Sequence, residues 1–255
     1  MQNGLEKSLP FGGNSGKSRL EDRALLPLAA PPPWFVHGMP GAGSDLVIAF
    51  ASIGHDPSRP PSPEFVASAS AKGRPALFIA DASRSWCNAP GLTELLEEAV
   101  AAIRQRQEIR RILTVGQSMG GFTALVAASL IKVDAVLAIG PQFSVDPSLM
   151  AEERWSDWTR RIVRFTHPTA PLPPDTAITL LHGLADDYAQ AMQFPAQNGV
   201  DHIFFPALSH SALAPHLKAK GCLQGLIEAA LSTDRRRLLR LTANAGGIRR
   251  ERWSA

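Results

Sequence analysis

The chain has 255 residues, of which 45% are hydrophobic and 19% are charged, so it can bury a sizeable core. This composition excludes a mainly disordered chain, and no run of about 18 apolar residues predicts a membrane span. The formal net charge of +3 is unevenly placed, because seven arginines stand between positions 235 and 252. The rest of the chain is close to neutral and carries no strong nucleic-acid signal.

The cysteines and the first residues bear on the compartment. Cys87 and Cys222 form neither a disulfide framework nor a zinc-binding spacing. The N-terminal stretch lacks an apolar core of signal-peptide length. We therefore expect a cytoplasmic protein with reduced thiols. The sequence leaves the oligomeric state open.

Residues 1–33 are rich in Gly, Ser and Pro and end in three prolines, which predicts an extended, partly disordered lead-in. The stretch FGGNSGKS, 11–18, ends like a phosphate-binding loop. It has Phe11 where the pattern needs glycine, and no apolar strand precedes it, so we reject nucleotide binding there.

From residue 45 onward, short apolar runs alternate with stretches of helical period. We predict strands at 45–50, 75–80, 111–115, 134–140, 177–183 and 202–206, and helices at 92–106 and 122–130. Apolar strands separated by helices indicate an α/β fold, with a mainly parallel sheet and helices on both faces. We place this domain at 34–232 and expect a solvated, basic C-terminal tail at 233–255.

One segment interrupts this alternation. Residues 141–176 contain MAEERWSDWTRRIVRF and then several prolines, which predicts a short helical insertion between two strands. Trp155 and Trp158 lie in it. They either cover the mouth of an active site, as part of a substrate pocket, or pack against the sheet.

The pentapeptide Gly116-Gln117-Ser118-Met119-Gly120 matches the pattern G-x-S-x-G between a strand and a helix. Glycines two positions before and after the serine let strand and helix approach closely. The Met119 amide would lie at the helix N-terminus, where partial positive charge favours an oxyanion. We predict that Ser118 is a nucleophile rather than part of a glycine-rich turn.

A nucleophilic serine needs a base to accept its proton and a carboxylate to hold that base. The stretch LLHGLADDYAQA turns at Gly183, after a strand, and then reaches Asp186 and Asp187. We favour Asp186 as the acid because of its G-x-x-D spacing, and keep Asp187 as the alternative. The other aspartate is expected to cap a helix that begins near Tyr188.

The base is expected after the acid in the chain. His210 stands in FFPALSHSALAP, in a loop that follows the strand at 202–205. His216 is the nearest rival, but its surroundings predict a helix. His55 precedes Ser118 in the chain, which is the wrong order for the base.

Taken together, GQSMG at 116–120, HGLADD at 182–187 and LSHSAL at 208–213 resemble the α/β-hydrolase superfamily over roughly residues 34–232. The resemblance implies that Ser118 is the nucleophile, Asp186 the acid and His210 the base. It also implies an oxyanion hole made by the Met119 amide and by an amide just after an early strand.

That early loop is ASIG, 51–54, which departs from the H-G forms frequent in the superfamily. We choose Ala51 as the second oxyanion donor, with Ser52 next. Ser52 also faces the expected pocket. The loop DASRSW, 81–86, follows the next strand, so Trp86 is a further candidate pocket residue.

The predicted function is that of a serine hydrolase, which cleaves an ester or thioester of a small acyl substrate. It needs no metal or organic cofactor. An acyltransferase with the same triad is the first alternative. A non-catalytic binding module is the second, although no triad residue is missing. A nucleic-acid or membrane partner held by the basic tail is a weaker idea.

Overall fold

The computed structural model describes residues 24–254, which form one α/β domain around a nine-stranded sheet. The strands are β1 (Leu26–Leu28), β2 (Trp34–Met39), β3 (Asp45–Phe50), β4 (Ala76–Asp81), β5 (Arg111–Gln117), β6 (Ala135–Ile139), β7 (Ala177–Gly183), β8 (Val200–Phe205) and β9 (Ile248–Arg249). Their order across the sheet is β1-β2-β4-β3-β5-β6-β7-β8-β9. Strands β3 to β8 run parallel, and β1, β2 and β9 are antiparallel to their neighbours.

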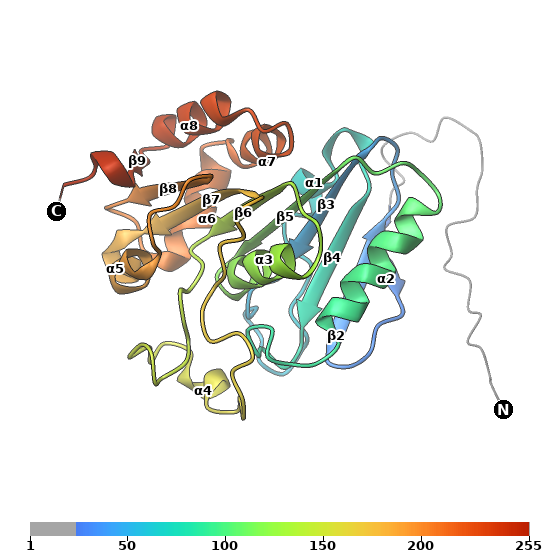
Figure 1. Ribbon diagram of the computed structural model, residues 1–255, viewed down its shortest axis with the longest axis horizontal. Coiled ribbons are helices and arrows are strands. Elements are labelled where there is room, and N and C mark those ends of the chain that lie inside the picture. The colour runs from blue at the N-terminus through green and yellow to red at the C-terminus, as the bar shows by residue number, and fades with distance from the viewer. Residues whose placement is uncertain (1–23, 255) are drawn as a thin grey trace.

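Helices cover both faces of this sheet (Figure 1). They are α1 (Val66–Ala69), α2 (Leu92–Arg104), α3 (Met119–Leu130), α4 (Ser156–Thr159), α5 (Leu184–Gln193), α6 (His210–Ala219), α7 (Leu223–Leu231) and α8 (Arg235–Asn244), with two 3₁₀ helices at Ala71–Gly73 and Arg250–Arg252. Alternate residues of β3 point to opposite faces: Leu46 and Ile48 join the core under α2 and α3, and Val47 joins the core under α6 and α7. The predicted fold class is therefore confirmed.

The strands in the centre of the sheet were the best predicted. β3 and β7 have the predicted bounds, because a parallel strand covered on both faces reads as an uninterrupted apolar run. β2 was missed because it alternates between buried and exposed residues and lies outside the region of clear βα alternation. In the described part of the chain, no helix has the length and apolar character needed to cross a lipid bilayer.

The predicted lead-in, 1–33, is corrected where the structure describes it. Residues Leu26–Leu28 form β1 and pair with β2, so they belong to the sheet. The rejected phosphate-binding stretch at 11–18 lies outside the described residues.

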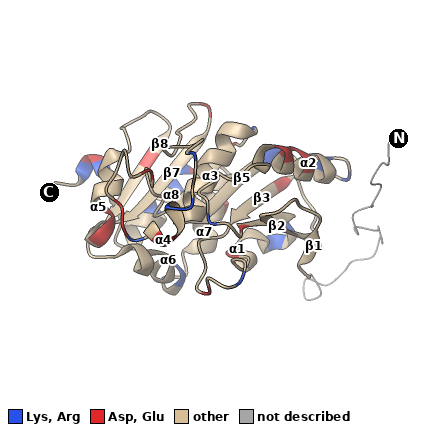
Figure 2. Ribbon diagram, turned by 90° about the horizontal axis from the view of Figure 1, so that it is seen from below, with Lys and Arg blue, Asp and Glu red and all other residues tan. Residues whose placement is uncertain are grey.

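The prediction of a solvated tail at 233–255 was wrong for the part that the structure describes. Helix α8 buries Leu238 in the core beneath α7, and β9 extends the sheet beside β8. Arg235 forms an ion pair with Asp201 on β8. Basic residues are spread over several elements, with acidic residues on many of the same elements (Figure 2). The leucines between the arginines form an apolar helix face that packs on the core, while Arg235, Arg236 and Arg240 stay exposed on the other face.

The insertion at 141–176 contains less helix than predicted. Its helical part is α4, four residues long, and the rest is turns and extended chain. Prolines at 168, 171, 173 and 174 prevent a longer helix in the second half. The arrangement leaves the side chains of Arg154 and Trp155 close to the ends of β7 and β8, where they reach the site described next.

Candidate active site

Ser118 occupies a tight turn between β5 and α3. Its backbone has φ 55° and ψ −126°, a strained conformation for a residue with a side chain. A Cβ atom at Gly116 would lie 2.2 Å from the backbone of Gly120, and one at Gly120 would lie 2.3 Å from the carbonyl oxygen of Phe50. Both glycines are therefore required for the close approach of the strand and helix. The turn leaves the Ser118 side chain at the carboxyl end of β5.

His210 lies within hydrogen-bond distance of this serine. Nε2 of His210 is 2.9 Å from Oγ of Ser118, and Nδ1 of His210 is 2.7 Å from Oδ2 of Asp187. The three residues follow β5, β7 and β8, whose carboxyl ends meet at one edge of the sheet. His210 is the first residue of α6 rather than part of a loop. The rival His216 lies on the same helix and hydrogen-bonds the carbonyl of Ala245.

The structure replaces Asp186 by Asp187 as the partner of the His210 ring. The Asp186 carboxylate instead accepts a hydrogen bond of 2.6 Å from the backbone N–H of His210. Helix α5 begins at Leu184, not near Tyr188, so both aspartates lie in its first turn. Successive residues of a helix point about 100° apart, so only one carboxylate faces the imidazole. Asp187 is that residue, and only 2% of its side chain is exposed.

Asp187 has a second partner, which the sequence did not suggest. Nη1 of Arg154, in the insertion, donates to Oδ1 of Asp187 over 2.8 Å. Burial raises the pKa of the Asp187 carboxyl, but the hydrogen bond and charge of His210 and the hydrogen bond from Arg154 outweigh it, so the pKa lies below the usual value. The carboxylate is therefore ionised and held in place from both sides.

The amides beside Ser118 differ in their availability to an incoming oxygen. The Met119 N–H stands at the start of α3, where a helix offers no internal acceptor. The Ala51 N–H donates to the carbonyl of Ile79 over 2.9 Å, as part of the sheet ladder. Ala51 was therefore a wrong choice for an oxyanion donor, because a ladder bond fixes its N–H within the sheet.

Ser52, the second choice, is held by an acidic side chain. Both its backbone N–H, at 3.1 Å, and its hydroxyl, at 2.5 Å, donate to Oε1 of Glu64. Burial raises the pKa of the Glu64 carboxyl against the lowering effect of these hydrogen bonds. The Ser52 amide is thus outside the sheet ladder but already has an acceptor.

The three tryptophans proposed for the pocket separate into two groups. Trp155 packs against the His210 ring, with centroids 5.1 Å apart, and against Trp86 at 6.1 Å. The ring of Trp158 is instead covered by the guanidinium groups of Arg84 and Arg161, 4.4 Å and 4.7 Å from its centroid. Trp155 therefore lies beside the His210 ring with Trp86 behind it, and these two tryptophans form an aromatic wall; the ring contacts of Trp158 are with the two arginines.

Sequence reasoning missed Arg154, Glu64 and a buried glutamine, Gln142, whose side chain reaches Ser118. Arg154 and Glu64 stand in loops without a local motif, so nothing in the sequence distinguishes them. Gln142 had a usable signal, because it follows β6, whose carboxyl end lies at the same edge as Ser118.

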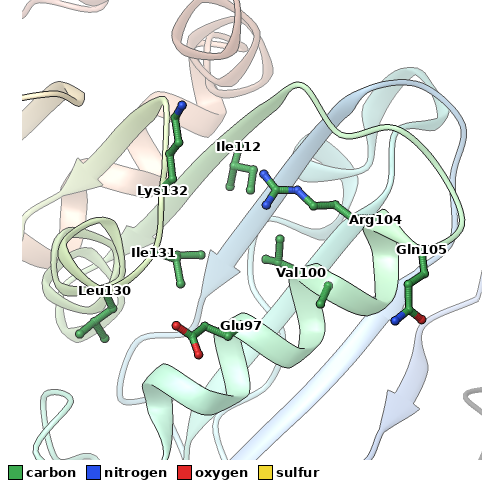
Figure 3. Close-up of a pocket in the computed structure, with 9 residues that line it drawn as sticks. Glu97, Val100, Arg104, Gln105, Ile112, Leu130, Ile131 and Lys132 are labelled. Carbon is green, nitrogen blue, oxygen red and sulfur yellow. The ribbon is translucent and has the colours of Figure 1, made fainter.

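A pocket of about 590 Å³ lies elsewhere, between the ends of α2 and α3 and the start of β5 (Figure 3). Ile112, near the start of β5, lines it, whereas Ser118 follows the opposite end of that strand. Arg104 and Lys132 are also in its lining. We do not assign this pocket to the candidate site, because it lies at the opposite edge of the sheet from Ser118 and His210.

No protein-family model matches the sequence, and no curated protein matches it. Among solved structures, the chain is similar to a capsule O-acetyltransferase of Neisseria meningitidis serogroup A, with a TM-score of 0.58, 10% identity, and coverage of 86% of this chain and 97% of that one. It is also similar to an esterase of Pyrococcus furiosus, with a TM-score of 0.52, 12% identity, and coverage of 89% and 95%.

A third similar structure is an α/β serine hydrolase without a lid from Xanthomonas campestris, with a TM-score of 0.51, 18% identity, and coverage of 80% and 92%. At such identities the likeness concerns the fold alone. The parallel sheet, its helices and these neighbours show that this chain has the α/β-hydrolase fold.

Proposed function

We propose that this protein is a serine hydrolase that cleaves a carboxylic ester or thioester through an acyl-enzyme on Ser118. The observation that carries the proposal is the chain of contacts from Ser118 Oγ to His210 Nε2, at 2.9 Å, and from His210 Nδ1 to Asp187, at 2.7 Å. A base within hydrogen-bond reach of a serine, oriented by a carboxylate, is the arrangement that activates a hydroxyl for attack.

In the first half-reaction, Ser118 Oγ attacks the acyl carbonyl while its proton passes to Nε2 of His210. The carbonyl electrons move onto oxygen, and the Met119 N–H stabilises this oxyanion. The C–O or C–S bond to the leaving group then breaks, and the proton on His210 passes to that group. Asp187 stabilises the imidazolium formed in between.

In the second half-reaction, water attacks the acyl-enzyme and gives its proton to His210. The acyl–Oγ bond then breaks, and Ser118 Oγ takes that proton from His210 as the acid product leaves. Ser52 is the candidate for the second oxyanion donor, because its amide is outside the sheet ladder. Glu64 accepts from that amide, so a substrate oxygen would have to take the place of its carboxylate.

Labelling with a fluorophosphonate tests the proposal without knowledge of the substrate. The Ser118 Oγ–P bond forms, fluoride leaves with the P–F electrons, and His210 takes the proton. We expect an adduct that peptide mass mapping assigns to Ser118. A parent protein that is not labelled, or that is labelled at another residue, would contradict the proposal.

An acyltransferase is the second candidate, supported by the similarity of fold to an O-acetyltransferase. An alcohol would then replace water as the acceptor on the same acyl-enzyme. Once an ester that the protein cleaves is found, the product ratio with added alcohols distinguishes the two. Transfer that exceeds hydrolysis at low alcohol concentration would favour the acyltransferase.

A further inference from the structure

Gln142 is a buried side chain that links the nucleophile to the aromatic wall. It follows β6 and is only 1% exposed. Its Nε2 donates to Oγ of Ser118 over 3.2 Å, and its Oε1 accepts from the indole N–H of Trp86 over 2.8 Å. Trp86 is itself fully buried. A glutamine is costly to bury unless its polar atoms are paired, and here both ends have a partner.

Trp86 determines which end of the amide faces the serine. The indole N–H can only donate a hydrogen bond, so it requires the oxygen of Gln142 as its acceptor. The NH₂ group of Gln142 is therefore directed at Ser118. With a donor on one side, the Ser118 hydroxyl has its own proton left for Nε2 of His210, at 2.9 Å.

The backbone around Gln142 is also fixed. His182 donates from Nε2 to the carbonyl of Pro141 over 2.8 Å, and Oε1 of Gln190 accepts from the amide of Phe143 over 2.7 Å. Both side chains are buried. The residues before and after Gln142 are thus held from two directions, so its amide has little freedom to leave Ser118.

We propose that Gln142 is a catalytic residue, which donates a hydrogen bond to Ser118 Oγ and stabilises negative charge on that atom. The inference rests on the proposed function. Charge develops on Oγ when its proton passes to His210 during attack, and again when the acyl–Oγ bond breaks and Oγ leaves with the electron pair. A fixed donor in a buried site stabilises such charge more than water would, and Ser118 and Gln142 are both buried.

Trp86 is a positioning residue, because its indole N–H holds Gln142, and Gln142 contacts Ser118 Oγ. Its backbone has φ 48°, and the next residue, Cys87, has φ 63°. Two consecutive side-chain-bearing residues in the left-handed region are strained, and the surrounding structure has to hold them there. The buried indole hydrogen bond to Gln142 is one of the contacts that does so.

The test measures the rate of fluorophosphonate labelling of Ser118 in the full chain. Gln142→Met keeps the length of the side chain and removes the donor, and we expect labelling to slow by about 100-fold. Gln142→Leu removes both polar ends of the amide and cannot donate in any protonation state, so we expect at least the same loss. Circular dichroism identifies any variant that fails to fold, and the other of the two then decides.

Trp86→Phe frees the amide to turn, and we expect labelling to slow by about tenfold. Trp34→Phe is the matched control, because Trp34 is also buried and its indole N–H donates to the carbonyl oxygen of Pro90 over 2.8 Å rather than to Gln142. It should label at the parent's rate. Combining Trp86→Phe with Gln142→Met should slow labelling no further than Gln142→Met alone.

The outcomes separate this inference from the proposed function. If the parent is not labelled at Ser118, the proposed function fails and the role of Gln142 fails with it. If the parent is labelled and the folded Gln142 variants are labelled equally fast, only the role of Gln142 is wrong. If the effects of Trp86→Phe and Gln142→Met multiply, Trp86 acts through packing and is not a positioning residue.

Discussion

Arg154 donates a hydrogen bond of 2.8 Å to one oxygen of Asp187, and His210 contacts the other oxygen of the same carboxylate. The arginine comes from the insertion between β6 and β7, so this loop is physically part of the candidate active site. Nη2 of Arg154 also forms an ion pair of 2.6 Å with Glu152, which holds the guanidinium in place. The insertion therefore orients Asp187, the acid of the proposed triad.

We expect Arg154→Ala to reduce turnover by about tenfold and the free energy of unfolding by about 1–3 kcal/mol, since a buried Asp187 oxygen loses its donor. Steady-state kinetics and thermal denaturation check the two effects. Arg160→Ala is the matched control, because Arg160 belongs to the same insertion and pairs with an exposed Asp157. Equal losses in both variants would mean that the insertion acts through its fold rather than through Asp187.

The two adjacent aspartates allow a direct comparison. Asp187→Asn should lower turnover by about 10³- to 10⁴-fold, because the amide neither stabilises the imidazolium nor holds the correct tautomer. Asp186→Asn should lower it far less, since Asp186 contacts the backbone N–H of His210 and, at 3.9 Å, Arg154, but not the imidazole ring. The rates at which the two variants are labelled at Ser118 show which carboxylate orients His210. A larger loss in Asp186→Asn would support Asp186, the acid favoured from the sequence.

Ser118→Ala should abolish labelling while leaving the free energy of unfolding unchanged or slightly higher. The backbone keeps its φ of 55°, so the strain of the turn remains in the variant. Only one hydroxyl is lost, and a residue selected for catalysis is often not the most stable choice at its position. His210→Ala should be comparably inactive on any ester found as substrate. The double variant should be hardly worse than either single one, because the triad works as a unit. Full turnover in Ser118→Ala would rule out the acyl-enzyme.

Two buried histidines predict how stability depends on pH. Nε2 of His182 donates to Pro141, so its Nδ1 is the acceptor for Nε2 of His202, 2.8 Å away. Burial lowers the pKa of His182 to about 4, and burial and the charge of His182 also lower the pKa of His202. Both rings are therefore neutral in the folded protein at neutral pH.

In the unfolded chain, both histidines would take up a proton near pH 6.5. Between about pH 6.5 and pH 4 the unfolded chain binds more protons than the folded protein, so the free energy of unfolding falls as the pH falls through this window. Above about pH 6.5 the two histidines no longer change it. We expect the melting temperature to fall across that window. His202→Gln, which removes one of the two groups, should make the fall shallower when melting curves are compared pH by pH. An unchanged slope in this variant would contradict the assignment.

Several features followed from the sequence by itself, because they depend on local patterns. A strand buried on both faces is an apolar run, and β3 and β7 were predicted to the residue. The glycines around Ser118 predicted a close approach of strand and helix, and the order of strands placed Ser118 and His210 at one edge of a parallel sheet. These expectations depended only on residues close together in the chain and on the rule that the carboxyl ends of parallel strands lie at one edge of the sheet.

Only the tertiary structure decided the features that depend on the direction of a side chain and on partners far away in the sequence. Asp186 and Asp187 are adjacent, and the exact start of α5 determines which carboxylate faces His210. The Ala51 N–H donates to the carbonyl of Ile79 on the neighbouring strand, a contact that no local pattern predicts. Helix α8 packs on a core whose other residues come from distant parts of the chain, and Gln142 hydrogen-bonds Trp86, which lies 56 positions before it. Such contacts depend on packing in three dimensions, whereas hydrophobic periodicity records only which face of an element is buried.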